Sequence, residues 1–315
     1  MSPMNKYPEE LIDALTKGTY IFIGAGISKL AGYPLWNELA YLLIELFWDQ
    51  KEQVPNPNFS FNYTQKDHLF TLLKTKDNPI MVMDFLASIN EEHFYNSLKS
   101  IFDDVRAGKE NPNIFMRFNE LKNIVSNKFI QVNIDDGFQR ALKIGDNEID
   151  VNDNFSDKKL TYLHGKIGNK HSIVFLRRKY DDGYLDERSK IMEYLIPIFR
   201  NNNVVFFGYS LRDYEILQAI SRARIQSNRS GNKPRKHYLF EAVWESKSTE
   251  YEIAREYYSR NYDVEMLRYD LSDKDYKKMF DVIDDVSQEV NKKYQLEKQN
   301  DPLRREVTGE HNATP

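Results

Sequence analysis

Two runs of mostly β-branched and aromatic residues stand out along the chain, at residues 19–23 and 203–207. Such runs are typical of strands buried on both faces, as in a parallel sheet. Shorter apolar runs predict further strands at residues 128–132, 160–163, 237–240 and 264–267, with a weaker candidate at 172–175.

Apolar residues with helical spacing lie between these runs and predict helices that alternate with the strands. The first expected helix ends before Gly18, in the usual position of a C-terminal glycine. Pro197 is expected to kink or shorten one of the later helices. The expected helices span residues 9–16, 35–48, 191–199, 213–225 and 249–260, with a short one through Leu142 and a charged one from about 273 to 298. The alternation predicts an α/β fold with a Rossmann-like parallel sheet and helices on both faces.

Residues 51–123 differ from the rest, because apolar positions there have helical spacing and no comparable strand run interrupts them. We therefore expect a single domain over residues 1–298 that contains a helical insertion at about 51–123. The polar residues 299–315 are expected to form a disordered tail.

Composition excludes several classes of site. The 315 residues include no cysteine, so disulfides, thiolate zinc sites and cysteine nucleophiles are excluded. The formal charge is −4, which gives no overall attraction to nucleic acid. No stretch is apolar enough to span a membrane, and the first ten residues lack the apolar segment of a signal peptide. We expect a cytoplasmic protein.

Polar residues follow four of the expected strands, where ligands bind in parallel sheets. The first group is Gly24-Ala25-Gly26-Ile27-Ser28. Its glycines let the backbone approach a phosphate closely, but the same residues could form a structural turn. Lys29 stands where a dinucleotide fingerprint has its third glycine, so the motif alone does not decide between the two.

Two further groups are equally ambiguous when taken alone. Asn133 and Asp135 could hold a ribose hydroxyl, a nicotinamide amide or a water, or Asp135 or Asp136 could cap the helix that follows. Ser210, which follows Gly208, could bind a phosphate or a ribose, or Ser210 or Asp213 could only cap the helix that follows.

His164 is the most distinctive of the six histidines, because it ends a short strand and precedes Gly165. The glycine permits close approach of a ligand. Imidazole has a reference pKa near 6.5, which suits proton transfer at neutral pH.

In this order and placement, the four groups resemble the motifs of the sirtuin family, over about residues 15–225. By this resemblance the loop that begins at Gly24 would bind the diphosphate and nearby ribose of NAD through Ala25, Gly26 and Ser28. The family's catalytic histidine also precedes a glycine and would correspond to His164.

The remaining motifs match in part. Asn133 and Asp135 would lie around the nicotinamide ribose, although the glutamine of the family's Gln-Asn-Ile-Asp element is replaced by Val132. Gly208 and Ser210 would contact the adenosine side. The resemblance implies NAD+ as the substrate.

Two departures redirect the expected activity. Protein-deacylating sirtuins hold a structural zinc with four cysteines, which this chain lacks, so we expect neither zinc nor another metal. Their Pro-Asp-Phe-Arg element is absent too. The sequence Gly-Tyr-Pro-Leu-Trp-Asn at residues 32–37 is instead similar to bacterial sirtuin-like NAD hydrolases of anti-phage systems, as is Gly-Tyr-Ser-Leu-Arg-Asp at 208–213.

We therefore expect an NAD+ hydrolase that depletes NAD+ in anti-phage defence, with Asn133, Asp135 and His164 as catalytic residues. Uncontrolled activity would kill the host, so we expect gating by homo-oligomer assembly or by a separate partner, such as a hexameric ATPase or a nucleic-acid-guided protein. An NAD-dependent protein deacylase and a non-catalytic NAD or ADP-ribose sensor are the alternatives. The charged helix near the C-terminus could dock a partner or could be a solvated face.

Overall fold

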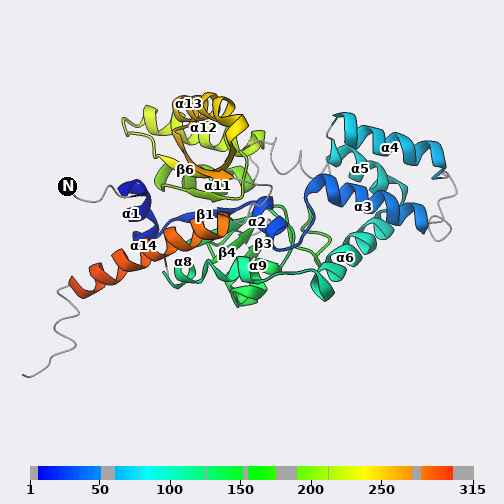
Figure 1. The fold of residues 1–315 in the computed structure, drawn as a ribbon, viewed down its shortest axis with the longest axis horizontal. Coiled ribbons are helices and arrows are strands. Elements are labelled where there is room, and N and C mark those ends of the chain that lie inside the picture. Colours follow the sequence, from blue (N-terminus) through cyan, green and yellow to red (C-terminus); the bar gives the residue numbers. More distant parts are fainter. Residues whose placement is uncertain are drawn as a thin grey trace, which may run out of the picture.

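The computed structural model describes residues 6–50, 61–76, 78–124, 126–151, 155–174, 190–211, 213–271 and 278–300. Its centre is a seven-stranded parallel sheet with the strand order β3-β4-β2-β1-β5-β6-β7 (Figure 1). The strands are β1 Tyr20–Ile23, β2 Lys128–Gln131, β3 Ile149–Val151, β4 Leu160–Tyr162, β5 Val205–Phe207, β6 His237–Trp244 and β7 Val264–Leu271. The expected α/β fold with a parallel sheet is confirmed.

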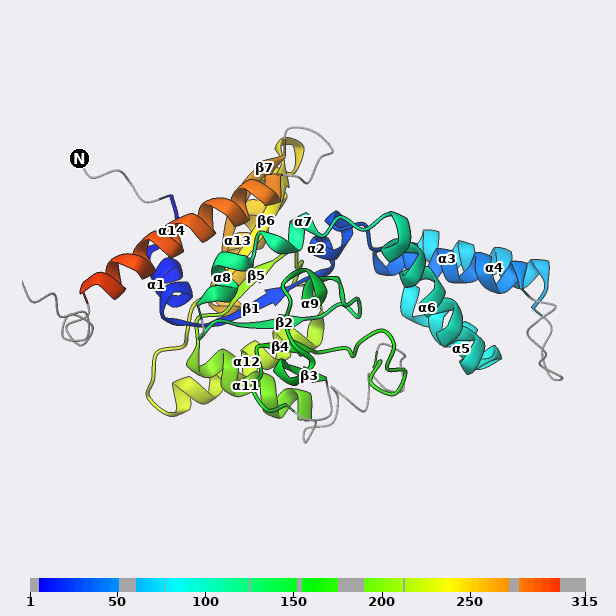
Figure 2. The ribbon, with the colours of Figure 1, turned by 90° about the horizontal axis from the view of Figure 1, so that it is seen from below.

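Helices cover both faces of the sheet (Figure 2). Ile21 and Ile23 belong to one buried cluster, with residues of α1, α8 and α14, whereas Phe22 belongs to a second cluster with residues of α11, α12 and α13. Successive strand residues point to opposite faces, so these continuous apolar runs fill two layers. The helices concerned are α1 Glu9–Lys17, α8 Asn119–Asn123, α11 Lys190–Asn201, α12 Tyr214–Arg229, α13 Ser248–Tyr262 and α14 Lys278–Asn300.

The middle of the sheet contains a point where the strand order reverses. β1 pairs with β2 on one side and with β5 on the other, so Phe22 lies opposite both Ile130 and Phe206. The chain after β1 builds the sheet first on the β2 side and later on the β5 side. In open parallel sheets, the crevice beyond the strand ends at such a reversal is where ligands bind.

A bundle of four helices lies beside the sheet, next to α2 Ala25–Leu30 (Figure 1). We call it the helical lobe. It comprises α3 Trp36–Asp49, α4 Tyr63–Lys76, α5 Pro79–Ile89 and α6 Glu91–Gly108, and its interior contains Leu43, Val82, Leu86, Phe94 and Leu98. The described part of residues 51–123 is mostly helical, the helical lobe already begins with α3 at Trp36, and residues 51–60 lie outside the described residues. The chain returns to β2 through α7 Asn113–Met116 and α8.

Several local expectations need correction. α11 continues past Pro197 to Asn201, so the expectation of an early end is wrong. Ile198 and Phe199 beyond the proline are buried, and their packing outweighs the lost backbone hydrogen bond. Residues 172–174 form no strand, and residue 175 lies outside the described residues.

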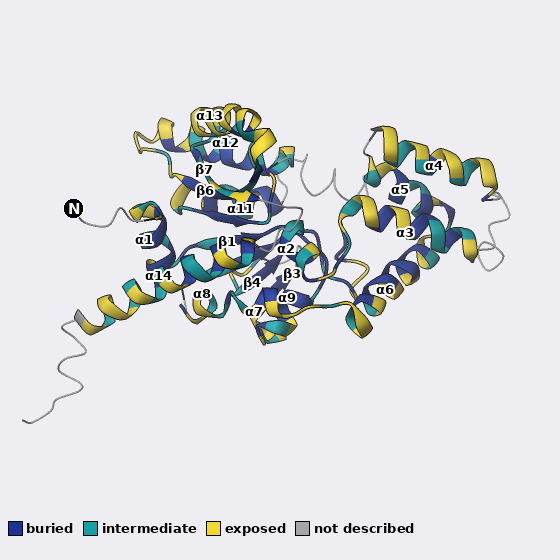
Figure 3. Cartoon of the chain, in the orientation of Figure 1, coloured by how far each residue is buried: buried dark blue, intermediate teal, exposed yellow. Residues whose placement is uncertain are grey.

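The C-terminal helix is amphipathic. Ile283, Val286 and Val290 of α14 are fully buried against the sheet layer, while much of its other face is exposed (Figure 3). The helix reaches Asn300, two residues beyond the expected end, and the rest of the expected tail lies outside the described residues.

Candidate functional site

The glycine-rich segment after β1 starts a helix, α2, at Ala25 rather than forming an extended loop. Gly24 and Gly26 pack directly against the loop that follows β5. The Gly26 amide donates a 2.9 Å hydrogen bond to the Gly208 carbonyl, and a Cβ atom added to Gly24 would lie 2.3 Å from the same oxygen. Close backbone packing at the reversal point therefore explains why Gly24 cannot carry a side chain.

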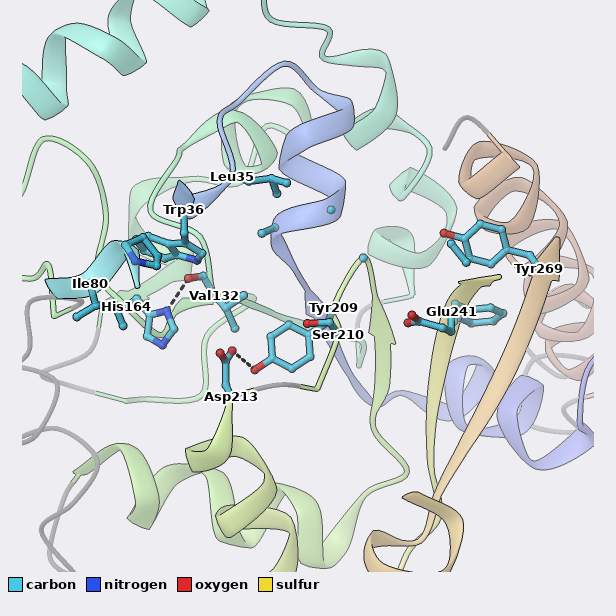
Figure 4. A pocket seen from close by; sticks show the side chains of 16 residues that line it. Leu35, Trp36, Ile80, Val132, His164, Tyr209, Ser210, Asp213, Glu241 and Tyr269 are labelled. Carbon is cyan, nitrogen blue, oxygen red and sulfur yellow. Dashed lines mark hydrogen bonds between the residues drawn. The ribbon is translucent and has the colours of Figure 1, made fainter. Parts of the chain in front are cut away.

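A cavity of about 450 Å³ opens beyond these strand ends (Figure 4). Its size lies within the range of small-molecule sites. Five of the expected site residues line it, namely Ala25, Gly26, His164, Gly208 and Ser210. Among the other lining residues, Trp36, Asp213, Glu241 and Tyr269 are four that were not expected to contact a ligand. We call this space the large cavity.

His164 lies immediately beyond β4 and is only 7% exposed. Its Nδ1 lies 2.7 Å from the carbonyl oxygen of Val132. Because a carbonyl only accepts, Nδ1 carries the hydrogen, and Nε2 of the neutral ring is an acceptor. Burial lowers the pKa of His164, an effect that the nearby Asp213 carboxylate opposes. The ring is thus held neutral near pH 7, as a proton acceptor must be.

The loop after β5 positions the carboxylate of Asp213. Asp213 is the N-cap of α12 but makes no side-chain capping bond. It accepts instead a hydrogen bond from the hydroxyl of Tyr209 (Figure 4). Ser210 is exposed at the cavity wall, and Leu211 adopts a left-handed backbone conformation with φ of 49°. Such strain is common where a loop shapes a site.

Asn133, Asp135 and Ser28 line a second, smaller space of about 20 Å³. We call it the small pocket. Trp36 and Ala25 line both spaces and form the wall between them. The volume is enough for about one water molecule.

Three polar side chains in the small pocket form a continuous chain of hydrogen bonds. The Asn133 Nδ2 lies 2.7 Å from Ser28 Oγ, which lies 2.7 Å from Asp135 Oδ2. The other Asp135 oxygen accepts from the Gly137 amide at 3.2 Å, at the start of α9 Gly137–Ala141. The aspartate therefore contacts both the helix end and the pocket side chains. Burial raises its pKa to about 6, although the Ser28 and Gly137 hydrogen bonds oppose this.

Gln131, a buried polar residue that the sequence analysis did not single out, holds the loop that contains Asp135. Gln131, the last residue of β2, is fully buried, and its Nε2 donates a 2.7 Å hydrogen bond to the backbone carbonyl of Asp135. The available signal was a polar side chain directly after the apolar pair Phe129-Ile130 of the strand, since buried polar groups need partners.

A charged network joins the helical lobe to the same loop. Arg106 of α6 contacts the Asp136 carboxylate at 2.7 Å, and Arg140 of α9 contacts both Asp136 and Glu110. The Tyr33 hydroxyl donates to Glu110 at 3.0 Å. These contacts tie the segment before Trp36 to the segment that contains Asp135.

A comparison with protein-family models matches part of the chain. A family model described as a SIR2-like domain matches residues 127–267, which include Asn133, Asp135, His164, Gly208 and Ser210. The glycine-rich segment and the helical lobe lie outside the matched range. No curated protein matches the chain.

The matched SIR2-like domain implies NAD+ use and an NAD-related activity. Within the described ranges, no helix is long and apolar enough to cross a membrane.

Proposed function

We propose that the protein is an NAD+ glycohydrolase that converts NAD+ and water to ADP-ribose, nicotinamide and a proton. One observation carries the proposal. The large cavity contains His164, and behind the wall formed by Trp36 lies a small pocket that contains Asn133 and Asp135. A space for a ligand therefore adjoins a polar pocket of water size, and both are lined in part by residues of the segment that the SIR2-like model matches.

The ADP half of the substrate is assigned to the large cavity. Ala25, Gly26 and Gly208 present backbone close to the cavity, which suits approach of the diphosphate. Glu241 and Tyr269 lie across the cavity from His164, from β6 and β7, where the adenosine end would extend (Figure 4).

The reaction is assigned to the boundary between the two spaces. The C1′–N bond of the nicotinamide ribose breaks, and its electron pair goes to the pyridinium nitrogen, so nicotinamide leaves as a neutral base. A water oxygen forms the new bond to C1′ and gives a proton to His164 Nε2, which returns it to solvent. Asn133 orients the water or the ribose hydroxyls, and the Asp135 carboxylate stabilises the cationic nicotinamide ribose.

We further propose that the enzyme is gated and acts as the effector of a bacterial anti-phage system that depletes NAD+. The motif at residues 32–37 supports this, because it is similar to the hydrolases of such systems. The small volume beside Asn133 supports gating, because about 20 Å³ does not hold a pyridine ring. Trp36 is the first residue of α3, so assembly or a partner that moves the helical lobe would change this pocket.

An NAD+ consumption assay on the full chain tests the activity, alone and with the product of the neighbouring gene. We expect nicotinamide and ADP-ribose to appear without any peptide, and His164→Ala to lower kcat by about 10²- to 10⁴-fold. His68→Ala, at an exposed position of α4, is the matched control.

Two outcomes would overturn the proposal. Nicotinamide release that depends on an acetylated peptide would indicate a deacylase. Tight NAD+ binding without any product in either condition would indicate a sensor.

A further inference from the structure

We propose that Ser28 is a positioning residue, which holds the side-chain amide of Asn133 with its oxygen facing the small pocket. This inference rests on the proposed hydrolase function, in which Asn133 orients a water or a ribose hydroxyl. It gives Ser28 a different task from diphosphate binding, because its hydroxyl is directed to Asn133 and Asp135.

The direction of the hydrogen bonds follows from the acceptor at one end of the chain. An ionised carboxylate only accepts hydrogen bonds. The 2.7 Å contact between Ser28 Oγ and Asp135 Oδ2 therefore uses the single hydroxyl hydrogen of Ser28. Ser28 has no second hydrogen, so toward Asn133 it can only accept.

The orientation of the amide follows from that step. Only the NH₂ group of the Asn133 amide can donate to Ser28 Oγ, across 2.7 Å. Its Oδ1 is therefore on the opposite side of the amide group. An amide turned by 180° has almost the same shape but would offer a donor instead of an acceptor. Ser28 thus decides which of the two groups a water in the small pocket meets.

The surroundings hold this arrangement in place. Ser28 is 4% exposed and Asp135 is 1% exposed, so solvent does not compete for their hydrogen bonds. Asp135 is anchored by the Gly137 amide and, through its backbone carbonyl, by Gln131. This row of hydrogen bonds therefore connects α2 to the end of β2. It fixes the Asn133 oxygen as an acceptor for water before any substrate arrives, so these polar groups need not reorganise during the reaction.

A double-mutant cycle on the full chain tests the inference through kcat and KM for NAD+. Ser28→Ala should lower kcat by about 10- to 100-fold with KM unchanged, because the amide loses the acceptor that orients it. The double variant Ser28→Ala/Asn133→Ala should be no slower than Asn133→Ala, because Ser28 acts only through Asn133. Ser28→Thr keeps the hydroxyl and should restore most of the rate.

Ser97→Ala is the matched control. Ser97 is a buried serine of α6 (3% exposed) whose hydroxyl has no hydrogen-bond partner among the described residues, and its loss should leave kcat unchanged. Asp135→Asn tests the same series of hydrogen bonds at its Asp135 end, and this test does not depend on whether Ser28→Ala folds. An asparagine there can present a donor to Ser28, which reverses the chain and should lower kcat in the same way.

A second measurement does not depend on turnover. In protein labelled with ¹⁵N-asparagine, the side-chain NH₂ signal of Asn133 is identified by its absence in Asn133→Ala. We expect Ser28→Ala to shift this signal and speed its exchange with solvent, whereas Ser97→Ala leaves both unchanged. An unshifted signal, or effects of Ser28→Ala and Asn133→Ala that add, would overturn the inference. If the chain consumes no NAD+ but the signal shifts as expected, the hydrolase proposal fails and the orientation stands.

Discussion

The large cavity and the small pocket share a wall but differ in almost every physical property. The large cavity measures about 450 Å³, and most of its lining side chains are apolar. The small pocket measures about 20 Å³, and its polar groups are bonded to one another. The first has the volume and surface that give binding energy. The second has preorganised polar groups but no room for a large ligand, which is typical of a place where charge develops during a reaction.

This difference predicts that affinity and turnover can be separated by mutation. The largest expected effect is on turnover. Asn133→Ala should lower kcat by about 10²- to 10⁴-fold, a loss comparable to that expected for His164→Ala, because either change removes a group assigned to the attacking water. The affinity for ADP-ribose, measured by calorimetry, should stay unchanged in Asn133→Ala, since ADP-ribose is assigned to the large cavity. A parallel loss of ADP-ribose affinity would contradict the division into two functions.

The sequence predicts most of the fold, but it does not predict the separation of the site into a large cavity and a small pocket. The buried runs at β1, β2 and β5 identify central strands because few other structures accept such residues. β3 was missed because it has only three residues, one of them Asp150. The placement of the four polar groups at one edge follows from parallel strands, and the sequence suffices to predict it.

The roles of Ser28 and Trp36 depend on tertiary geometry. Because α2 begins at Ala25, Ser28 lies almost one turn later and faces Asn133, whereas Gly26 faces Gly208. A linear motif does not reveal that separation. Trp36 lines both spaces because α3 brings its first residue beside α2 and the loop that follows β2, and this depends on how the helical lobe packs.

The next largest effect concerns the charge inside the small pocket. The folded-state pKa of Asp135 is about 6, above its ordinary value of 3.8. Protonated Asp135 can donate a hydrogen to Ser28, whereas the hydrogen bonds that orient Asn133 need Asp135 to accept one. We therefore expect kcat to fall as the pH falls through about 6. Asp136, Tyr33 and Tyr162 carry the titratable groups that act on Asp135, and burial raises the pKa of both tyrosine hydroxyls, so neither tyrosine ionises near pH 6.

The same pKa sets a stability prediction with a definite sign. A raised carboxyl pKa stabilises the fold below pH 3.8, and this stabilisation is lost as the pH rises through about 6. Above that, burial of the carboxylate costs up to about 3 kcal/mol. Asp135→Asn should therefore raise the melting temperature at pH 8 but not at pH 4, while lowering kcat. A melting temperature that falls equally at both values would show that the hydrogen bonds outweigh the cost of burial.

A smaller effect is expected at the far end of the large cavity. Among the lining residues in the described part of the chain, Asp213 and Glu241 are acidic and none is a lysine or arginine. A phosphate on an adenosine ribose placed beside Glu241 would be repelled by its carboxylate. We therefore expect kcat/KM to be higher for NAD+ than for NADP+, with Glu241→Lys reducing this preference by about 10-fold and Glu241→Gln by less. An unchanged ratio in Glu241→Lys would place the adenosine ribose elsewhere.

The smallest effect tests the wall between the two spaces. If Trp36 closes the small pocket, Trp36→Ala joins it to the large cavity and favours the open state that a nicotinamide ring needs. Hydrolysis by the isolated chain should then rise by about 2- to 10-fold. Stimulation by a partner or by assembly should shrink by a similar factor, because the mutation has already shifted the equilibrium toward the open pocket. Trp36→Phe keeps an aromatic ring in the wall and serves as the control. A lower rate in Trp36→Ala with gating intact would mean that Trp36 positions the substrate, and the two spaces would then work as one site.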